Sequence, residues 1–183
     1  QTEIMKVSAS SLKSYEQCPK KYYYNYIEKL PRKDWGHLVL GNFCHTILEY
    51  FHLELIEGSK EKYNIIMKQS FERALKKYKL DNKQIIEAKE MLTNYLQSVS
   101  DKGKMPNVKG VETDFNFMIN DNILIRGFID RVDVLDDGRF HIVDYKTTKN
   151  DKYLDTFQLL IYGLWLKHTY PDVDHFRVSY ILL

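Results

Sequence analysis

The stretches that decide the fold are GFIDRVD at residues 127–133 and IVDYKT at residues 142–147. Each holds apolar residues that run into acidic ones, and Asp136-Asp137-Gly138 between them is a typical hairpin turn. We therefore predict two antiparallel strands joined by a turn centred on Asp137. Residues at equal distances from that centre face one another in this register.

The predicted register places two carboxylates directly opposite one another, those of Asp130 and Asp144, with Cβ atoms about 4.5–5.5 Å apart. Lys146 follows Asp144 by two residues and points to the same face. Facing carboxylates repel, and a shared divalent cation removes this cost; Mg²⁺ or Mn²⁺ suits such hard oxygen ligands. A lysine beside the ion suits phosphodiester hydrolysis. The alternative is a surface strand with Asp144–Lys146 and Asp130–Arg131 ion pairs, and a slip of one residue would undo the geometry.

The rest of the chain changes from helical to strand patterns near residue 105. Hydroxyl caps and apolar spacing predict helices beginning at Ser8 and at residues 20–27, 38–56, 59–79 and 84–99. Alternation predicts strands at residues 111–119, 123–134, 140–147 and 175–183. A helix capped by Asn150 or Asp151 and running to about Lys167 is apolar on most sides and is expected to be buried.

Composition limits the class of protein. The 183 residues, 44% of them hydrophobic, suit one globular domain spanning residues 1–183, with a helical part (1–105) and a catalytic αβ core (106–183). Lys and Arg number 27 against 25 Asp and Glu, so a nucleic-acid site requires clustered rather than numerous cations. Having only two cysteines suits the reducing cytoplasm. The sequence contains no run of 18 apolar residues, so it predicts no membrane span. The start at Gln1 and the end directly after the last predicted strand suggest a truncated chain.

Five blocks in order resemble the PD-(D/E)xK nuclease superfamily, and most closely its RecB-type branch, which includes the RecB and AddB nuclease domains and CRISPR-associated RecB-like exonucleases. The blocks are residues 8–23, 41–49, 127–133, 144–146 and 158–162. The resemblance implies a restriction-endonuclease-like α/β fold, with a central mixed sheet flanked by helices and a helical N-terminal half.

The resemblance also implies roles for individual residues. Asp130, Asp144, His45 and the backbone carbonyl of Tyr145 would bind Mg²⁺ or Mn²⁺, and Lys146 would be the catalytic lysine. Gln158 and Tyr162 share one helix face and would support the lysine and the DNA backbone. Glu112 matches a weaker acidic position. A packed or surface histidine and hydrogen-bonding core residues are the plainer interpretations of His45, Gln158 and Tyr162; Glu49, one turn after His45, either orients its ring or decorates the surface.

In part of this branch four cysteines hold a [4Fe-4S] cluster. Cys18 matches the first of them, while the other three would follow Leu183. Either this chain lacks the cluster or the segment that completes it is missing. Cys44 is expected to pack as a small apolar residue.

Bases and aromatic residues alternate near the N-terminus, where Lys20, Lys21 and Tyr22 suit phosphates and unpaired bases. Arg131 is a further candidate for DNA binding. The alternative is that these tyrosines are core residues and the lysines a solvated surface.

The predicted function is metal-dependent cleavage of DNA, as an exonuclease in recombination, repair or CRISPR adaptation, on DNA with single-stranded character. A helicase or CRISPR-type protein is the expected partner. The rival predictions are a catalytically inactive nuclease-fold module that binds DNA or protein, and a hydrolase of small phosphate esters.

Overall fold

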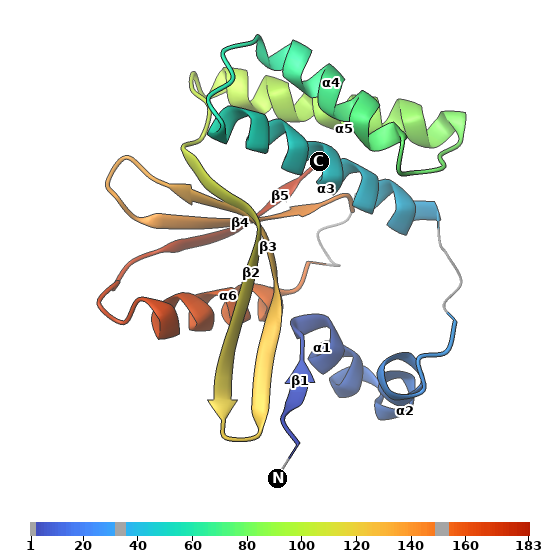
Figure 1. Ribbon diagram of the computed structural model, residues 1–183, viewed down its shortest axis with the longest axis vertical. Helices are drawn as coiled ribbons and strands as arrows, with labels where there is room; N and C mark the ends of the chain where they lie inside the picture. The colour runs from blue at the N-terminus through green and yellow to red at the C-terminus, as the bar shows by residue number, and fades with distance from the viewer. Residues whose placement is uncertain (1–2, 32–35, 149–153) are drawn as a thin grey trace.

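The computed structural model describes residues 3–31, 36–148 and 154–183 (Figure 1). They form a mixed five-stranded sheet with helices on both faces, which confirms the predicted α/β fold. The strands are β1 (Met5–Val7), β2 (Val108–Asn120), β3 (Ile123–Val134), β4 (Phe140–Lys146) and β5 (Arg177–Leu182). The helices are α1 (Ala9–Gln17), α2 (Pro19–Tyr22), the π-helical η1 (Tyr23–Ile27), α3 (Gly36–Ile56), α4 (Tyr63–Leu75), α5 (Asn82–Asp101) and α6 (Thr156–Thr169).

Strand β3 is the centre of the sheet. Antiparallel β2 follows it along one edge, with pairs from Val108–Asp133 to Asn120–Ile123. The other edge carries parallel β1 at residues 123–125 and antiparallel β4 at residues 131–134, and β5 then lies parallel to β4. On that second edge, residues 126–130 of β3 pair with no strand in the described part of the chain. The sheet is therefore open beside Asp130.

The predicted hairpin register is confirmed. β3 and β4 pair from Val134–Phe140 to Arg131–Val143, so paired residues are equally distant from Asp137. The turn closes through Gly138 at a φ of 82°, a left-handed conformation that glycine adopts without strain. The Asp137 carboxylate accepts hydrogen bonds from the backbone N–H and the guanidinium of Arg139.

Two hydrophobic clusters cover the two faces of the sheet. Helices α3, α4 and α5 pack over Val143 and Tyr145 of β4, in the upper part of Figure 1. Helix α6 packs on the other face against Phe115, Ile129 and Ile142, and Leu12 of α1 contributes to the same cluster. Alternate residues of β4 thus enter different cores, since Ile142 packs with α6 and Val143 with α3 to α5, which fixes the face to which its polar residues point.

The structure corrects two predictions of secondary structure. Strand β1 lies in the part of the chain predicted to be helical. Helix α6 begins at Thr156 and is capped by Asp155, whereas Asn150 and Asp151 lie outside the described residues.

The predicted burial of α6 on most sides is wrong, because Leu160 and Leu164 on one of its faces are 63% and 56% exposed. None of the helices in residues 3–31, 36–148 and 154–183 combines the length and the apolar character that a membrane span requires.

Candidate metal centre

The two aspartates lie where β3 and β4 separate. The backbone ladder ends at Arg131–Val143, one residue before the predicted Asp130–Asp144 pair. Beyond that point the Asp130 side chain replaces the backbone of β3 as hydrogen-bond partner of β4, because its Oδ2 accepts the Tyr145 backbone N–H at 2.8 Å. Asp144 is only 3% exposed. Burial and the charge of Asp130 raise the pKa of Asp144, against the lowering effects of Lys146 and Tyr162. The site therefore holds unfavourable negative charge.

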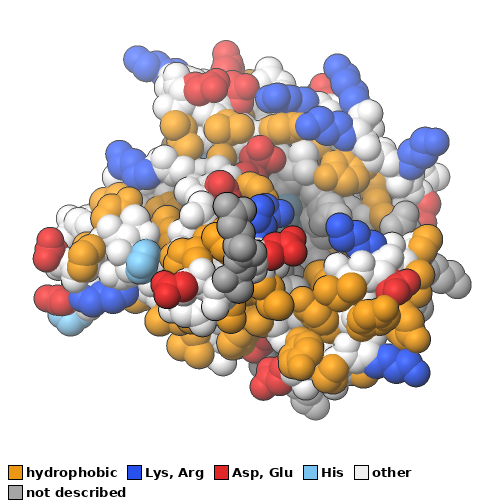
Figure 2. All heavy atoms as spheres, turned by 60° about the horizontal axis from the view of Figure 1, so that its bottom comes forward, with side chains coloured by type: hydrophobic (Ala, Val, Ile, Leu, Met, Phe, Trp, Pro, Cys, Tyr) orange, Lys and Arg blue, Asp and Glu red, His pale blue; other side chains and the backbone are white. Residues whose placement is uncertain are grey.

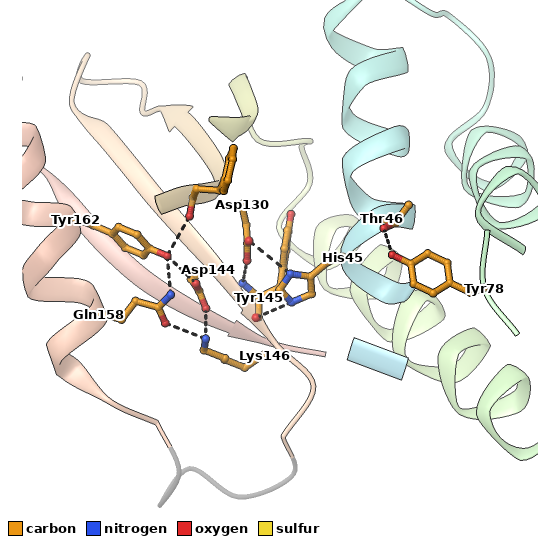
Figure 3. A network of polar contacts seen from close by, with 10 residues as sticks. His45, Thr46, Tyr78, Asp130, Asp144, Tyr145, Lys146, Gln158 and Tyr162 are labelled. Carbon is orange, nitrogen blue, oxygen red and sulfur yellow. Dashed lines mark hydrogen bonds and ion pairs between the residues drawn. The ribbon is translucent and has the colours of Figure 1, made fainter. Parts of the chain in front are cut away.

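Helix α3 brings His45 to the same place (Figure 3). Its Nε2 is 2.9 Å from the Tyr145 carbonyl oxygen, and its Nδ1 is 3.4 Å from Asp130 Oδ1. Burial lowers the pKa of His45, but the hydrogen bond to Asp130 and the charges of both aspartates outweigh it, so the pKa is raised. These two contacts orient the His45 ring, and neither of them comes from Glu49.

Lys146 belongs to a closed ring of polar contacts (Figure 3). Its Nζ donates to Gln158 Oε1 at 3.0 Å, and Gln158 Nε2 donates to the Tyr162 hydroxyl at 2.7 Å. That hydroxyl donates to Asp144 Oδ1 at 3.0 Å, and Asp144 Oδ2 lies 2.7 Å from Lys146 Nζ. Each member fixes the orientation of the next, so Lys146 is held beside the carboxylates.

Glu112 adds a third carboxylate from β2. Its φ of 44° lies in the left-handed region, which is strained for a residue with a side chain. Ligand atoms of Glu112, His45 and Asp130 all lie within 4.8 Å of one another. Burial, followed by the charges of Asp130 and Glu49, raises the pKa of Glu112 to about 7. Glu112 thus belongs to the acidic cluster.

The residues present fit a divalent cation. Carboxylate oxygens, a backbone carbonyl and one imidazole form a donor set that suits Mg²⁺ or Mn²⁺. The strongest indication is geometric, because ligand atoms of His45, Glu112 and Asp130 lie within 4.8 Å of one another. Burial first, and the charge of Asp130 second, raise the pKa values of Asp144 and Glu112. A cation would relieve this repulsion.

The residues predicted to contact DNA fall into two groups. Lys20 and Lys21 of α2 are exposed, and Tyr22 is half-buried with its ring stacked on Tyr26 at 5.2 Å. These three stay candidates.

Cys18 is exposed, and its Sγ accepts the Lys21 backbone N–H at 3.5 Å as the cap of α2. Cys44 is buried among helices α3 to α5, in agreement with its predicted packing role. Two cysteines do not make a four-thiolate cluster.

Arg131 is a correction, since the predicted DNA contact conflicts with a side chain that is 3% exposed. Its guanidinium donates to the hydroxyls of Tyr145 at 2.6 Å and Tyr95 at 2.8 Å, and to Asp133 at 2.9 Å. Tyr95 also contacts His52 Nε2 at 2.8 Å. This buried network holds the Tyr145 ring on the side of the sheet covered by α3 to α5.

The sequence reasoning missed this network. An arginine one residue after Asp130, inside a strand with buried neighbours, was the available signal, because a buried charge requires partners.

A comparison with protein families identifies the class of protein to which this fold belongs, that of the PD-(D/E)XK nucleases. Residues 6–183 match the profile of the PD-(D/E)XK nuclease superfamily, and the chain belongs to that superfamily.

Among curated proteins, the chain is similar to a subunit of the "ATP-dependent helicase/deoxyribonuclease" of Streptococcus agalactiae serotype Ia, at 26% identity over 79% of this chain and 14% of the relative. The protein of the same name from Streptococcus pyogenes serotype M12 is 26% identical over 98% of this chain and 18% of the relative. The matched regions thus make up less than a fifth of either relative.

Proposed function

We propose that this chain is a divalent-metal-dependent deoxyribonuclease domain that hydrolyses phosphodiester bonds in DNA repair or recombination, as an exonuclease. The observation that carries the proposal is the placement of Lys146, held by Gln158 and Asp144 beside a crowded carboxylate cluster. The names of the relatives, which are helicase/deoxyribonuclease subunits, support the choice of DNA as substrate.

In this proposal Asp130, Asp144, His45 and the Tyr145 carbonyl would hold Mg²⁺ or Mn²⁺. When bound, such an ion supplies Lewis acidity and lowers the pKa of a coordinated water. The Lys146 ammonium orients the attacking water and stabilises negative charge that develops on the phosphate oxygens. Burial of Asp144 keeps bulk water away from this contact, which strengthens the electrostatic interaction.

Gln158 and Tyr162 position these groups. The Gln158 amide accepts from Lys146 and donates to Tyr162, so the amide orientation is fixed by its two partners. The Tyr162 hydroxyl then donates to one oxygen of Asp144 and so orients the carboxylate.

The wider setting is part of the proposal. Exposed Lys20 and Lys21, together with Tyr22, are proposed to bind a DNA strand with single-stranded character. Because the relatives are named as helicase/deoxyribonuclease subunits, a helicase is the proposed protein partner, in the cytoplasm.

The test is degradation of end-labelled DNA with Mg²⁺ or Mn²⁺ by the wild type, Lys146→Ala and Asp130→Ala. Loss of the lysine should lower the rate about 10²–10³-fold, the usual effect of removing one preorganised group that stabilises transition-state charge. Lys68→Ala is the matched control, because the Lys68 side chain is 78% exposed on α4.

Full activity in both site variants would eliminate the assignment. If the wild type bound DNA without metal and did not cleave it, a binding module would be favoured. If it hydrolysed nucleotides but not polymers, a hydrolase of small phosphate esters would be favoured.

A further inference from the structure

An exposed phenylalanine stands among polar residues on one face of the β2–β3 hairpin. Residues alternate there: Phe115 and Ile129 are buried, whereas Asp114, Asn116 and Arg126 are exposed. Phe128 belongs to the exposed set and is 61% exposed. Its neighbour across the ladder is Asp114, so it is not part of an apolar patch at this point of the sheet. Burial in the core therefore does not explain this phenylalanine.

The position of Phe128 ties it to the candidate metal centre. Phe128 precedes Asp130 by two residues on β3, so the two Cα atoms are about 7 Å apart. The Tyr162 hydroxyl, which donates to Asp144 at 3.0 Å, also lies 3.4 Å from the Phe128 carbonyl oxygen. The short stretch of β3 from Phe128 to Asp130, together with this shared tyrosine, holds Phe128 at a fixed place relative to the aspartates.

Cations lie along the same face beyond Phe128. Arg126 precedes it by two residues, and Lys6 of β1 is paired with Leu124 of β3, so all three side chains share the face. Neither Arg126 nor Lys6 forms an ion pair with an acidic side chain among the described residues. Asp114 lies opposite Phe128 on β2 and repels phosphate from that side. Phosphates are therefore favoured over β1 and β3, and not over β2.

Figure 2 shows the molecule from the side on which α1 and the β2–β3 hairpin come forward. Basic and acidic side chains meet there in a hollow, with hydrophobic side chains around it. A strand of nucleic acid presents flat apolar bases and anionic phosphates, which suit hydrophobic and basic side chains respectively.

We propose that Phe128 is a base-stacking residue for an unpaired nucleotide next to the scissile phosphate, with the phosphates that follow on Arg126 and Lys6. The inference rests on the proposed function and names a contact within it. An unpaired base is required, because a ring that projects from a strand reaches a base face only where the base has no stacked neighbour. A protein ligand is disfavoured, since Asp114, Asn116 and Arg126 surround the ring with polar groups.

The test measures binding of a fluorescein-labelled single-stranded oligothymidylate by fluorescence anisotropy, with EDTA present to prevent cleavage. Phe128→Ala should raise the Kd about tenfold, which lies within the range for loss of one stacked base. Phe128→Trp should retain the affinity, and its indole emission should be quenched on binding. Leu160→Ala is the matched control, because Leu160 is 63% exposed on α6, which packs on the opposite face of the sheet.

A second probe carries one abasic nucleotide at successive positions. At one position this change should weaken binding to the wild type but not to Phe128→Ala, which would identify the stacked base. Wild-type affinity in Phe128→Ala, or equal losses in Phe128→Ala and Leu160→Ala, would overturn the inference while leaving the proposed function intact. A wild type that binds no oligonucleotide would instead contradict the proposed function, and this inference with it.

Discussion

Tyr162 links the glutamine that holds the proposed catalytic lysine to one of the carboxylates. Its hydroxyl accepts from Gln158 and donates to Asp144, so it closes the ring of contacts on the side away from Lys146. We expect Tyr162→Phe to lower the cleavage rate about 10–100-fold, as is usual when a group that orients a site residue is lost.

The measurement compares initial rates with those of Tyr170→Phe, a control in which the tyrosine is 41% exposed. Circular dichroism at the assay temperature verifies that both variants are folded. An unchanged rate in folded Tyr162→Phe would show that the closed ring around Lys146 has no positioning role.

Glu112 provides a prediction on stability. Its pKa is raised from 4.5 to about 7, so the folded chain binds more protons than the unfolded chain between these values. The free energy of unfolding contributed by this group therefore falls as pH rises through that window. Glu112→Gln removes the charge, and we expect its Tm near pH 8 to exceed the wild-type Tm by about 2–4 °C, allowing for solvent screening.

Thermal melts with a chelator present, at pH 4.5 and near pH 8, measure this difference. At the lower pH both side chains are largely neutral, so the two Tm values should converge. A variant that is less stable than the wild type near pH 8 would contradict the view that Glu112 is repelled by its neighbours.

At the scale of elements, Gly127 leaves room for the Phe115 ring, through which the β2–β3 hairpin packs against α6. A Cβ at this position would lie 2.8 Å from the Phe115 ring, which is closer than real contacts allow. Phe115 in turn packs edge-on against Tyr162 at 5.6 Å between ring centroids. We expect Gly127→Ala to displace this ring and to cost about 1–3 kcal/mol, the usual penalty of overpacking.

Urea denaturation monitors the loss, with Asn116→Ala as a control on the exposed face of β2. The double variant Gly127→Ala, Phe115→Leu should recover part of the stability, because its smaller side chain at position 115 leaves room for the added methyl group. If the urea midpoint of Gly127→Ala equalled that of the control, the Phe115 ring would move aside at no cost in stability.

Strong local patterns made part of this architecture predictable. Alternation and the turn at Asp136–Gly138 gave the bounds of β3 and its register with β4, because period-two burial has a single solution when both faces carry a core. The five sequence blocks indicated which polar residues meet, and the structure brings His45, Asp130 and Asp144 together.

The rest depended on tertiary contacts. Strand β1 has three residues, too few for a pattern, and exists through parallel pairing with residues 123–125. The all-round apolar pattern of α6 does not reveal which face stays open. Arg131 carries a charge usually found at surfaces, and its burial depends on Tyr95 and Tyr145 from other elements.

At the scale of the whole molecule, the candidate ligands come from both sides of the sheet's open edge. His45 lies on α3, Asp130 on β3 and Asp144 on β4. A cation that binds all three in the folded chain alone should stabilise it by mass action. With Mn²⁺ at about a hundred times its Kd, we expect Tm to rise by about 5–10 °C in a chain of this size.

Differential scanning fluorimetry against Mn²⁺ concentration tests this without relying on cleavage. Asp130→Asn should lose most of the shift, while Asp121→Asn, at the exposed β2–β3 turn, should retain it. Equal shifts in both variants would place the ion elsewhere on the molecule.

The backbone of the single residue Tyr145 sets the spacing of the site, because its N–H donates to Asp130 and its C=O contacts the His45 ring. One residue inserted into either arm of the β3–β4 hairpin would turn an aspartate to the opposite face. Residues added at the tip, between Val134 and Phe140, would leave that spacing untouched. Length variation among natural relatives is therefore expected at the tip of this hairpin and excluded from its arms.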